Sequence, residues 1–282
     1  MIAKVHKSRC VEIQGLVVHY CELNPHLPRT IVMLRGFRSS DQGLMSLAEQ
    51  FSDFHIIIPD FPGYGQTDEL NVSHTIYAYA QVINNFINTL GLKNITLIGH
   101  SFGGLVSLVY ASEHPELVSK LVLLSPVPKP TLASRATSLY YIIGRALPEP
   151  LSRHWLTSSS IHQPIRHFVA RTQDPALLAK IMSEGERELQ ELRPNINIEN
   201  YLSLINFDPT EWVERLKVPT LVISGDKDRL THPTDIINTY NSEIINLKII
   251  EGMGHYSPSE NPAELYQLCQ AWFKEDAEVA KL

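Results

Sequence analysis

The sequence has few features that would place the protein outside the cell or on nucleic acid. Its three cysteines, Cys10, Cys21 and Cys269, are an odd number without Cys-x-x-Cys spacing, so they predict free thiols of a reducing compartment. The 24 Lys and Arg residues are scattered and are outnumbered by 30 Asp and Glu, which argues against nucleic-acid binding. The first residues, MIAKVHKSRCVEIQ, contain no apolar run typical of a signal peptide, so we expect a cytoplasmic protein.

Long apolar segments and metal-ligand patterns are also scarce. Residues 94–112 form a long stretch without a charged side chain, and on length alone such a stretch can cross a bilayer. It contains Thr96, His100, Ser101 and three glycines, which suit a strand, a turn and a helix of a soluble core, so no membrane span is expected. The histidines show no metal-ligand spacing, and we expect neither a metal nor a cofactor.

Short apolar runs rich in Val and Ile recur along the chain and alternate with helical patterns. Most of these runs lack polar alternation, which is typical of parallel strands that are covered on both faces. The runs are LVVHY, TIVML, HIIIP, NITLIG, KLVLLS, PTLVIS and NLKIIE. Strand, helix and strand in repeated succession predict an α/β fold with a mostly parallel central sheet flanked by helices.

This alternation stops in the middle of the chain. Residues 127–216 carry helical apolar patterns without strand-like runs, and the strand pattern resumes at Val218. We therefore predict an α/β core built from residues 1–126 and 217–282, with residues 127–216 as an inserted helical cap.

One short motif carries chemistry. Ser101 lies in Gly99-His100-Ser101-Phe102-Gly103, directly after an apolar strand pattern and before a helical one. Small flanking residues permit the strained strand-to-helix turn that exposes a nucleophilic hydroxyl, although a glycine-rich turn without chemistry has the same pattern. A serine nucleophile also needs an imidazole and a carboxylate, so the rest of the chain decides between the two interpretations.

Both partners follow later strand patterns. TLVISGDKD places Asp226 and Asp228 after one run, and IIEGMGHYSPSENP places His255 after the last. The carboxyl ends of parallel strands meet at one edge of a sheet, which brings these residues towards Ser101. His100 is adjacent to Ser101 and is expected to pack beside the nucleophile rather than react.

With these motifs the whole chain, apart from the proposed cap, resembles the α/β-hydrolase family and its branch of capped serine hydrolases. The order Ser101, Asp, His255 is the family order. The resemblance assigns the acid in G-x-x-D to Asp228 and the turn support to Asp226. It also assigns the backbone N–H groups of Phe37 and Phe102 to the oxyanion hole.

The chain departs from the family at Arg35, where a histidine commonly precedes the glycine. Arg35 either binds an acidic substrate group or points away from the pocket to hold Asp60. Tyr140 and Trp155 either line an apolar substrate pocket or pack the cap onto the core.

The resemblance implies a carboxylic-ester hydrolase acting on a small-molecule acyl substrate. A carbon–carbon bond hydrolase, a lactonase and a thioesterase use the same triad, and a ligand-binding receptor with little turnover is a further alternative. Haloalkane dehalogenases and epoxide hydrolases of this fold carry an aspartate at the elbow, so Ser101 argues against both. The sequence leaves the substrate and the oligomeric state open.

Overall fold

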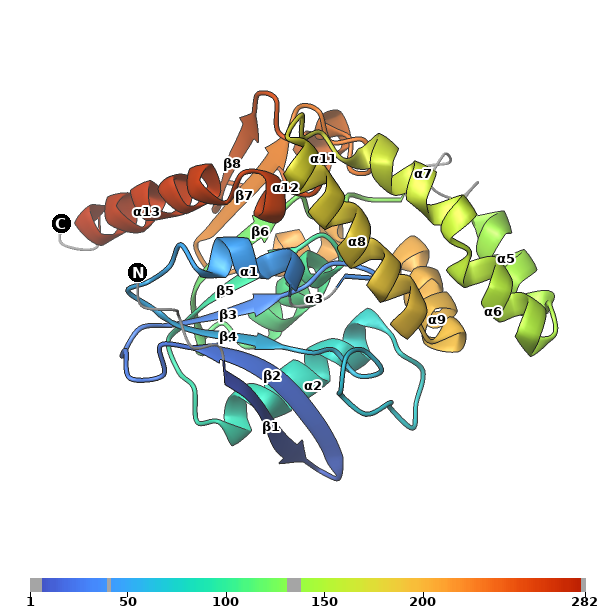
Figure 1. Ribbon diagram of the computed structural model, residues 1–282. Coiled ribbons are helices and arrows are strands. Elements are labelled where there is room, and N and C mark those ends of the chain that lie inside the picture. The colour runs from blue at the N-terminus through green and yellow to red at the C-terminus, as the bar shows by residue number, and fades with distance from the viewer. Residues whose placement is uncertain (1–6, 40–41, 131–137, 280–282) are drawn as a thin grey trace.

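A computed structural model describes residues 7–39, 42–130 and 138–279, and its centre is an eight-stranded sheet (Figure 1). The spatial order of the strands is β1-β2-β4-β3-β5-β6-β7-β8. β2 runs antiparallel to both of its neighbours, and the other neighbouring pairs are parallel. The strands are β1 (Lys7–Ile13), β2 (Leu16–Leu23), β3 (Thr30–Leu34), β4 (His55–Pro59), β5 (Ile95–His100), β6 (Val118–Leu124), β7 (Thr220–Gly225) and β8 (Ile245–Ile250). The predicted α/β fold with a mostly parallel sheet is confirmed.

Helices cover both faces of this sheet. Along β3, Ile31 and Met33 pack into one core cluster with Leu44, whereas Val32 and Leu34 pack into the other. This two-residue alternation buries both faces, which explains why the run TIVML shows no polar positions. α1 (Gln42–Ala48), α12 (Ser257–Glu260) and α13 (Pro262–Val279) lie together on the Leu44 side. The other face carries α2 (Ile76–Thr89), α3 (Phe102–Glu113) and α11 (Pro233–Thr239).

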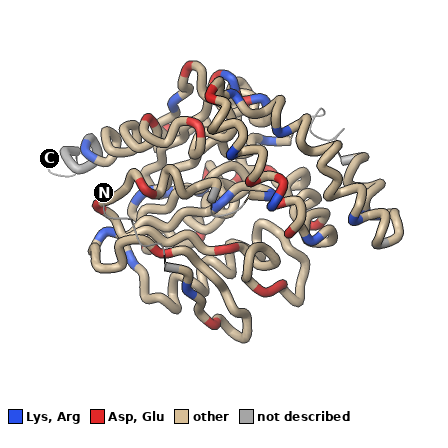
Figure 2. The backbone as a smooth tube through the Cα atoms, in the orientation of Figure 1, with Lys and Arg blue, Asp and Glu red and all other residues tan. Residues whose placement is uncertain are grey.

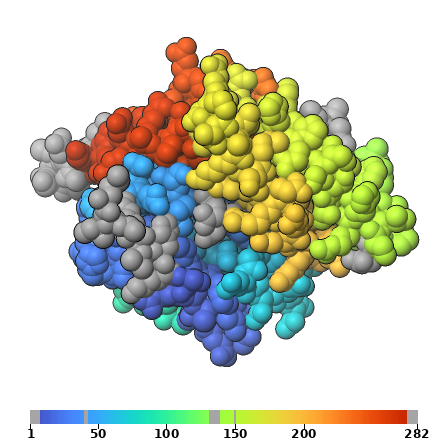
Figure 3. Space-filling view, viewed as in Figure 1, coloured from blue at the N-terminus to red at the C-terminus, as the bar shows by residue number. Residues whose placement is uncertain are grey.

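The segment between β6 and β7 is helical in its described part. α8 and α9 lie over the carboxyl edge of the sheet, and α5, α6 and α7 extend from them to the right (Figures 1 and 3). Their bounds are α5 (Ser138–Ala146), α6 (Glu149–Thr157), α7 (Ser159–Val169), α8 (Pro175–Glu191) and α9 (Pro194–Asn206). α10 (Thr210–Arg215) differs, because its Trp212 and Val213 are buried in the same core cluster as α2 and α3. The cap boundaries at 127 and 216 stay a prediction, and part of that range, 131–137, lies outside the described residues.

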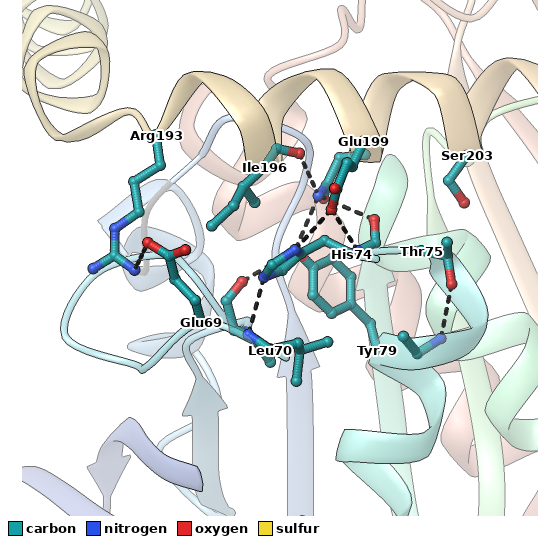
Figure 4. Close-up of polar contacts among 12 residues, drawn as sticks. Glu69, Leu70, His74, Thr75, Tyr79, Arg193, Ile196, Glu199 and Ser203 are labelled. Atoms are coloured by element: carbon teal, nitrogen blue, oxygen red, sulfur yellow. Dashed lines mark hydrogen bonds and ion pairs between the residues drawn. The ribbon is translucent and has the colours of Figure 1, made fainter. Parts of the chain in front are cut away.

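α9 is fastened to the core by a polar network (Figure 4). Leu70 N donates to Nε2 of His74 at 3.1 Å, so the ring proton is on Nδ1, which donates to Glu199 at 2.9 Å. Asn200 donates to the His74 carbonyl and to the Tyr79 hydroxyl. These bonds fix one end of the helical layer against the loop that precedes α2.

Candidate active site

Ser101 occupies a strained turn between β5 and α3. Its backbone has φ 52° and ψ −117°, a region that non-glycine residues rarely adopt. Both flanking glycines are required by space, because a Cβ at Gly99 would lie 2.4 Å from Ser107 Oγ and one at Gly103 would lie 2.4 Å from Leu34 O. The G-x-S-x-G spacing therefore lets α3 begin directly against β3 and β5 while the serine side chain lines a cavity.

The three expected triad residues lie in one hydrogen-bonded chain. His255 Nδ1 is 2.9 Å from Asp228 Oδ2, and His255 Nε2 is 3.1 Å from Ser101 Oγ. All three side chains are buried. Because the carboxylate accepts the Nδ1 proton, Nε2 carries the lone pair that can accept a proton from the serine hydroxyl.

Asp228 is held as a carboxylate by several donors. Its Oδ1 accepts from the backbone N–H groups of Leu230 and Thr231, both at 2.8 Å, and its Oδ2 accepts from Thr231 Oγ1 at 2.6 Å. Burial opposes ionisation of Asp228, but the neighbouring His255 and these hydrogen bonds outweigh it and keep the pKa of Asp228 well below its usual range. Asp226 instead supports the turn, since Gly252 N and Lys227 Nζ donate to it.

His100 packs behind His255. Its Nε2 lies 2.9 Å from the His255 carbonyl oxygen, so this nitrogen carries the proton and donates. Burial, followed by the nearby His255 ring, lowers the pKa of His100 to about 3, which keeps the ring neutral. The residue that precedes the serine thus positions the loop that carries the imidazole.

The two expected oxyanion donors flank Ser101. Phe102 is the first residue of α3, and the N–H groups of a helix's first turn lack partners inside the helix. Phe37 lines the cavity and follows Gly36, where a Cβ would lie 3.0 Å from His100 Nδ1, so a side chain at this position would force the His100 ring to shift. The oxyanion assignment stays a prediction that this placement supports.

A cavity of about 430 Å³ opens above Ser101 and His255, between the carboxyl edge of the sheet and the helical layer. From the helical layer Ile181, Tyr201, Leu204 and Ile205 contribute apolar surface. Two cationic side chains of the lining have partners, because Arg166 pairs with Glu188 and Lys129 pairs with Asp208. The space above the serine suits a small, largely apolar molecule.

A second cavity of about 860 Å³ lies beside the first, between α8 and the core. It shares Arg38, Ser39 and Glu188 with the first cavity, but neither Ser101 nor His255 is among the described residues that line it. Its lining includes charged residues from both sides, among them Glu49 and Arg187. The smaller cavity therefore holds the candidate chemistry.

Arg35 is placed away from the candidate nucleophile. Its side chain is buried, donates to Ser39 O at 2.6 Å, lies 3.6 Å from Asp60 and stacks over the Tyr64 ring. It borders the larger cavity and is not among the described residues around Ser101. Of its two interpretations, the structure favours the one in which Arg35 holds Asp60.

Tyr140 and Trp155 bond to each other inside the helical layer. The Tyr140 hydroxyl donates to Trp155 O at 2.7 Å, and Trp155 Nε1 donates to Tyr140 O at 3.1 Å. The described lining of the smaller cavity includes neither residue. Their placement favours packing of the cap over contact with a substrate.

Sequence reasoning missed Arg38, which joins the oxyanion loop to the helical layer. Its guanidinium lies 3.2 Å from His162 Nδ1 and donates to Leu156 O at 3.1 Å. The backbone of Arg38 has φ 54°, so it reaches this position through a left-handed turn. The only indication of this role in the sequence was that Arg38, a polar residue, directly follows the predicted oxyanion donor Phe37.

The described residues contain neither a cluster of metal ligands nor a helix that could span a bilayer. Among residues 7–39, 42–130 and 138–279, no group of three His, Cys, Asp or Glu side chains has the arrangement of a metal site. Within the same ranges, no helix is both long enough and apolar enough to cross a bilayer.

Comparisons with known proteins agree with this architecture. The family profile described as "alpha/beta hydrolase fold" matches residues 29–262. An uncharacterized hydrolase, YugF, of Bacillus subtilis is 26% identical over 92% of this chain and 94% of its own. The (E)-2-((N-methylformamido)methylene)succinate hydrolase of Acinetobacter baylyi is 26% identical over 91% and 94%. The solved esterase EaEST of Exiguobacterium antarcticum superposes with a TM-score of 0.80 at 18% identity, covering 95% of this chain and 100% of that one. The chain therefore belongs to the alpha/beta hydrolase fold family and is a hydrolase of that family.

Proposed function

We propose that this hydrolase cleaves a small carboxylic ester through an acyl-enzyme on Ser101, with His255 as base and acid and Asp228 as the orienting carboxylate. The observation that carries the proposal is the continuous chain of hydrogen bonds from Asp228 through His255 to Ser101 at the wall of the cavity. The names of the relatives agree with hydrolysis and leave the bond and the substrate open.

The first half of the reaction forms the acyl-enzyme. Ser101 Oγ attacks the ester carbonyl as its proton passes to His255 Nε2, and the carbonyl oxygen becomes an oxyanion. The N–H groups of Phe37 and Phe102 stabilise this oxyanion, and each such donor contributes on the order of 10²–10³ in rate. His255 then gives its proton to the leaving alcohol, and the C–O bond breaks.

The second half releases the acid. A water molecule takes the place of the alcohol and attacks the acyl carbon as its proton passes to His255 Nε2. The tetrahedral intermediate collapses, and the proton returns to Ser101 Oγ. The protein supplies the nucleophile, the base and the oxyanion donors in both halves, so the proposed route uses no cofactor.

The helical segment 127–216 is the proposed cap of this site. Ile181, Tyr201 and Leu204 form the apolar wall opposite the triad, so the cap selects the substrate and excludes water. We place the protein in the cytoplasm, with a small acyl compound as its partner.

Active-site titration tests the proposal. A p-nitrophenyl phosphonate ester should label the protein at one site, release one equivalent of nitrophenol and shift the mass of the peptide that contains Ser101. Ser101→Ala should not be labelled, and His255→Ala should be labelled far more slowly, because the hydroxyl then lacks its base. An unlabelled wild-type protein that turns over no compound in a panel of esters, thioesters, lactones and vinylogous diketones would favour the receptor alternative.

A further inference from the structure

One arginine of the helical layer lines the cavity above Ser101. Arg166 belongs to α7, and its side chain is only 18% exposed. Its guanidinium carbon lies 5.7 Å from the centre of the Tyr256 ring, which lines the same cavity. Because Tyr256 directly follows His255, Arg166 lies on the side of the cavity that carries the candidate base.

The place of this guanidinium depends on a glycine inside α8. A Cβ at Gly185 would lie 2.1 Å from Arg166 Nε and 2.4 Å from Arg166 Cζ. Glycine destabilises a helix interior relative to alanine, so its presence in the middle of a 17-residue helix calls for a reason in the packing. The guanidinium can lie against the backbone of α8 only because position 185 carries no side chain.

The guanidinium of Arg166 has more hydrogen-bond donors than its protein neighbours use. Its Nη2 group donates to Glu188 Oε2 at 2.9 Å, and no described residue accepts a hydrogen bond from Nε or Nη1. Among the described residues, the side-chain atoms that are both buried and without a partner include none of the nitrogens of Arg166. Nε and Nη1 therefore remain accessible, in a side chain that lines the cavity.

The charge of Arg166 is already balanced by the protein. α8 carries charges of both signs (Figure 2), and its Glu188, whose side chain is 9% exposed, pairs with Arg166. Glu184, which also lines the cavity, lies 3.8 Å from Lys180. A substrate carboxylate in this corner would add a negative charge beside two acids, and such like-charge contacts exclude a ligand. A neutral carbonyl, ether or hydroxyl oxygen accepts a hydrogen bond without adding charge.

We propose that Arg166 is a specificity-determining residue that selects esters with a second, neutral oxygen acceptor, such as oxo and alkoxy esters. Arg166 donates to that oxygen, while Glu188 holds the guanidinium in place and offsets its charge, which disfavours esters that carry a carboxylate. The consequence for turnover rests on the proposed ester hydrolysis at Ser101, whereas the binding preference does not require the reaction to proceed.

Matched pairs of esters measure the preference. Methyl 4-oxopentanoate and methyl pentanoate differ by one oxygen on the acyl side, and 2-methoxyethyl butyrate and butyl butyrate differ by one on the alcohol side. The ratio of kcat/KM within a pair reports the contribution of that oxygen. Loss of the Arg166 donor should lower this ratio about tenfold for at least one pair, because the oxygen loses a hydrogen bond from a charged group.

The variant Gly185→Ala displaces the guanidinium without removing it. The added Cβ collides only with the flexible end of Arg166, and alanine favours the helix, so the protein should still unfold cooperatively in urea. The ratio should fall about tenfold in this variant and in Arg166→Met/Glu188→Gln, which leaves no unpaired buried carboxylate. The control Arg153→Met removes an exposed arginine of α6 and should leave the ratio unchanged.

The role of Glu188 has its own variant. Glu188→Gln keeps an oxygen acceptor for Arg166 but leaves the arginine charge without its acid. We expect kcat/KM for monomethyl glutarate, relative to methyl pentanoate, to rise about tenfold in this variant, and the rise to shrink at about 0.5 M salt.

Binding to the Ser101→Ala protein separates this inference from the proposed reaction. Dissociation constants of the paired esters, measured by ligand-observed NMR, should show the preference in Ser101→Ala and its loss in Ser101→Ala/Gly185→Ala. That result together with a wild-type protein that turns over no ester would refute the proposed hydrolysis and leave the role of Arg166 standing. Two results would overturn the role of Arg166. One is a pair of dissociation constants whose ratio is the same with and without Gly185→Ala, and the other is monomethyl glutarate bound as tightly as the oxo ester while Glu188 is intact.

Discussion

The carboxylate of Asp228 and the imidazole of His255 meet in a single hydrogen bond of 2.9 Å, from Nδ1 to Oδ2. Asp226, in the same loop, instead accepts from Gly252 N at 2.6 Å and from Lys227 Nζ. Two acids that are equivalent by position thus differ in what they can do, because only Asp228 can fix the tautomer of His255 and stabilise its charged form.

Asparagine at each position separates these roles. We expect Asp228→Asn to lower kcat by about 10³–10⁴, because the amide favours the wrong imidazole tautomer. Asp226→Asn should keep kcat/KM within a few-fold while lowering the free energy of unfolding. Steady-state kinetics with p-nitrophenyl acetate and urea unfolding measure both effects, and equal losses of activity in the two variants would contradict the assignment.

The fold and the order of the motifs were predictable from the sequence because each depends on local pattern. A Cβ at Gly99 or Gly103 would collide with neighbouring atoms, and the same steric limit applies wherever a helix begins against a strand. The turn around Ser101 can therefore be recognised from residues 99–103 alone. The edge strand β1, with the sequence KSRCVEI, was missed because it pairs with β2 alone and shows no continuous apolar run.

Side-chain direction was not predictable in the same way. Arg35 and Arg38 flank Gly36 and Phe37, and no sequence pattern distinguishes which guanidinium faces the core and which faces the cap. The left-handed backbone of Arg38 decides it, because it turns that side chain towards His162. Tyr140 and Trp155 likewise satisfy each other's polar groups, a pairing that only the packed helices reveal.

Arg35 is expected to contribute to stability rather than to substrate selection. Arg35→Gln removes a buried hydrogen bond to Ser39 O and the ion pair with Asp60, and we expect a loss of about 2–3 kcal/mol in the free energy of unfolding. The control Arg29→Gln breaks an exposed pair with Asp53 and should cost no more than about 1 kcal/mol.

Kinetics complete the Arg35 test. KM for a carboxylate-bearing ester and for its neutral methyl analogue should change by the same factor in Arg35→Gln. A rise in KM confined to the acidic ester would show instead that Arg35 binds the substrate.

Arg38 is expected to position the oxyanion loop. It donates to His162 Nδ1, so His162 Nε2 carries the proton and donates to Tyr140 Oη at 2.9 Å. Burial, and then the charge of Arg38, lowers the pKa of His162 to about 4, which keeps this ring a neutral acceptor. These hydrogen bonds connect Arg38, the residue after Phe37, to α6 and α7.

Loss of the Arg38 hydrogen bonds should lower kcat more than it changes KM. We expect Arg38→Gln to lower kcat by about 10- to 100-fold with KM for a small ester nearly unchanged, because the Phe37 N–H loses its alignment. Arg153→Gln, an exposed arginine of the same helical layer, is the control and should leave both constants unchanged. A variant in which KM rises and kcat does not would place Arg38 in substrate binding.

His100 should make the stability of the fold sensitive to acid. Its pKa is lowered from 6.5 to about 3 in the folded protein, so below pH 6.5 the unfolded chain binds a proton that the folded chain does not. The free energy of unfolding therefore falls as the pH drops from about 6.5 towards 3, by up to about 1.4 kcal/mol per pH unit from this one group.

His100→Gln keeps an amide donor for the His255 carbonyl and cannot titrate. Urea unfolding of both proteins at intervals from pH 7 to pH 4 should give a shallower pH dependence for the variant. His162 titrates in both proteins, so its contribution cancels in the difference. Parallel curves would show that His100 does not stay neutral in the folded state.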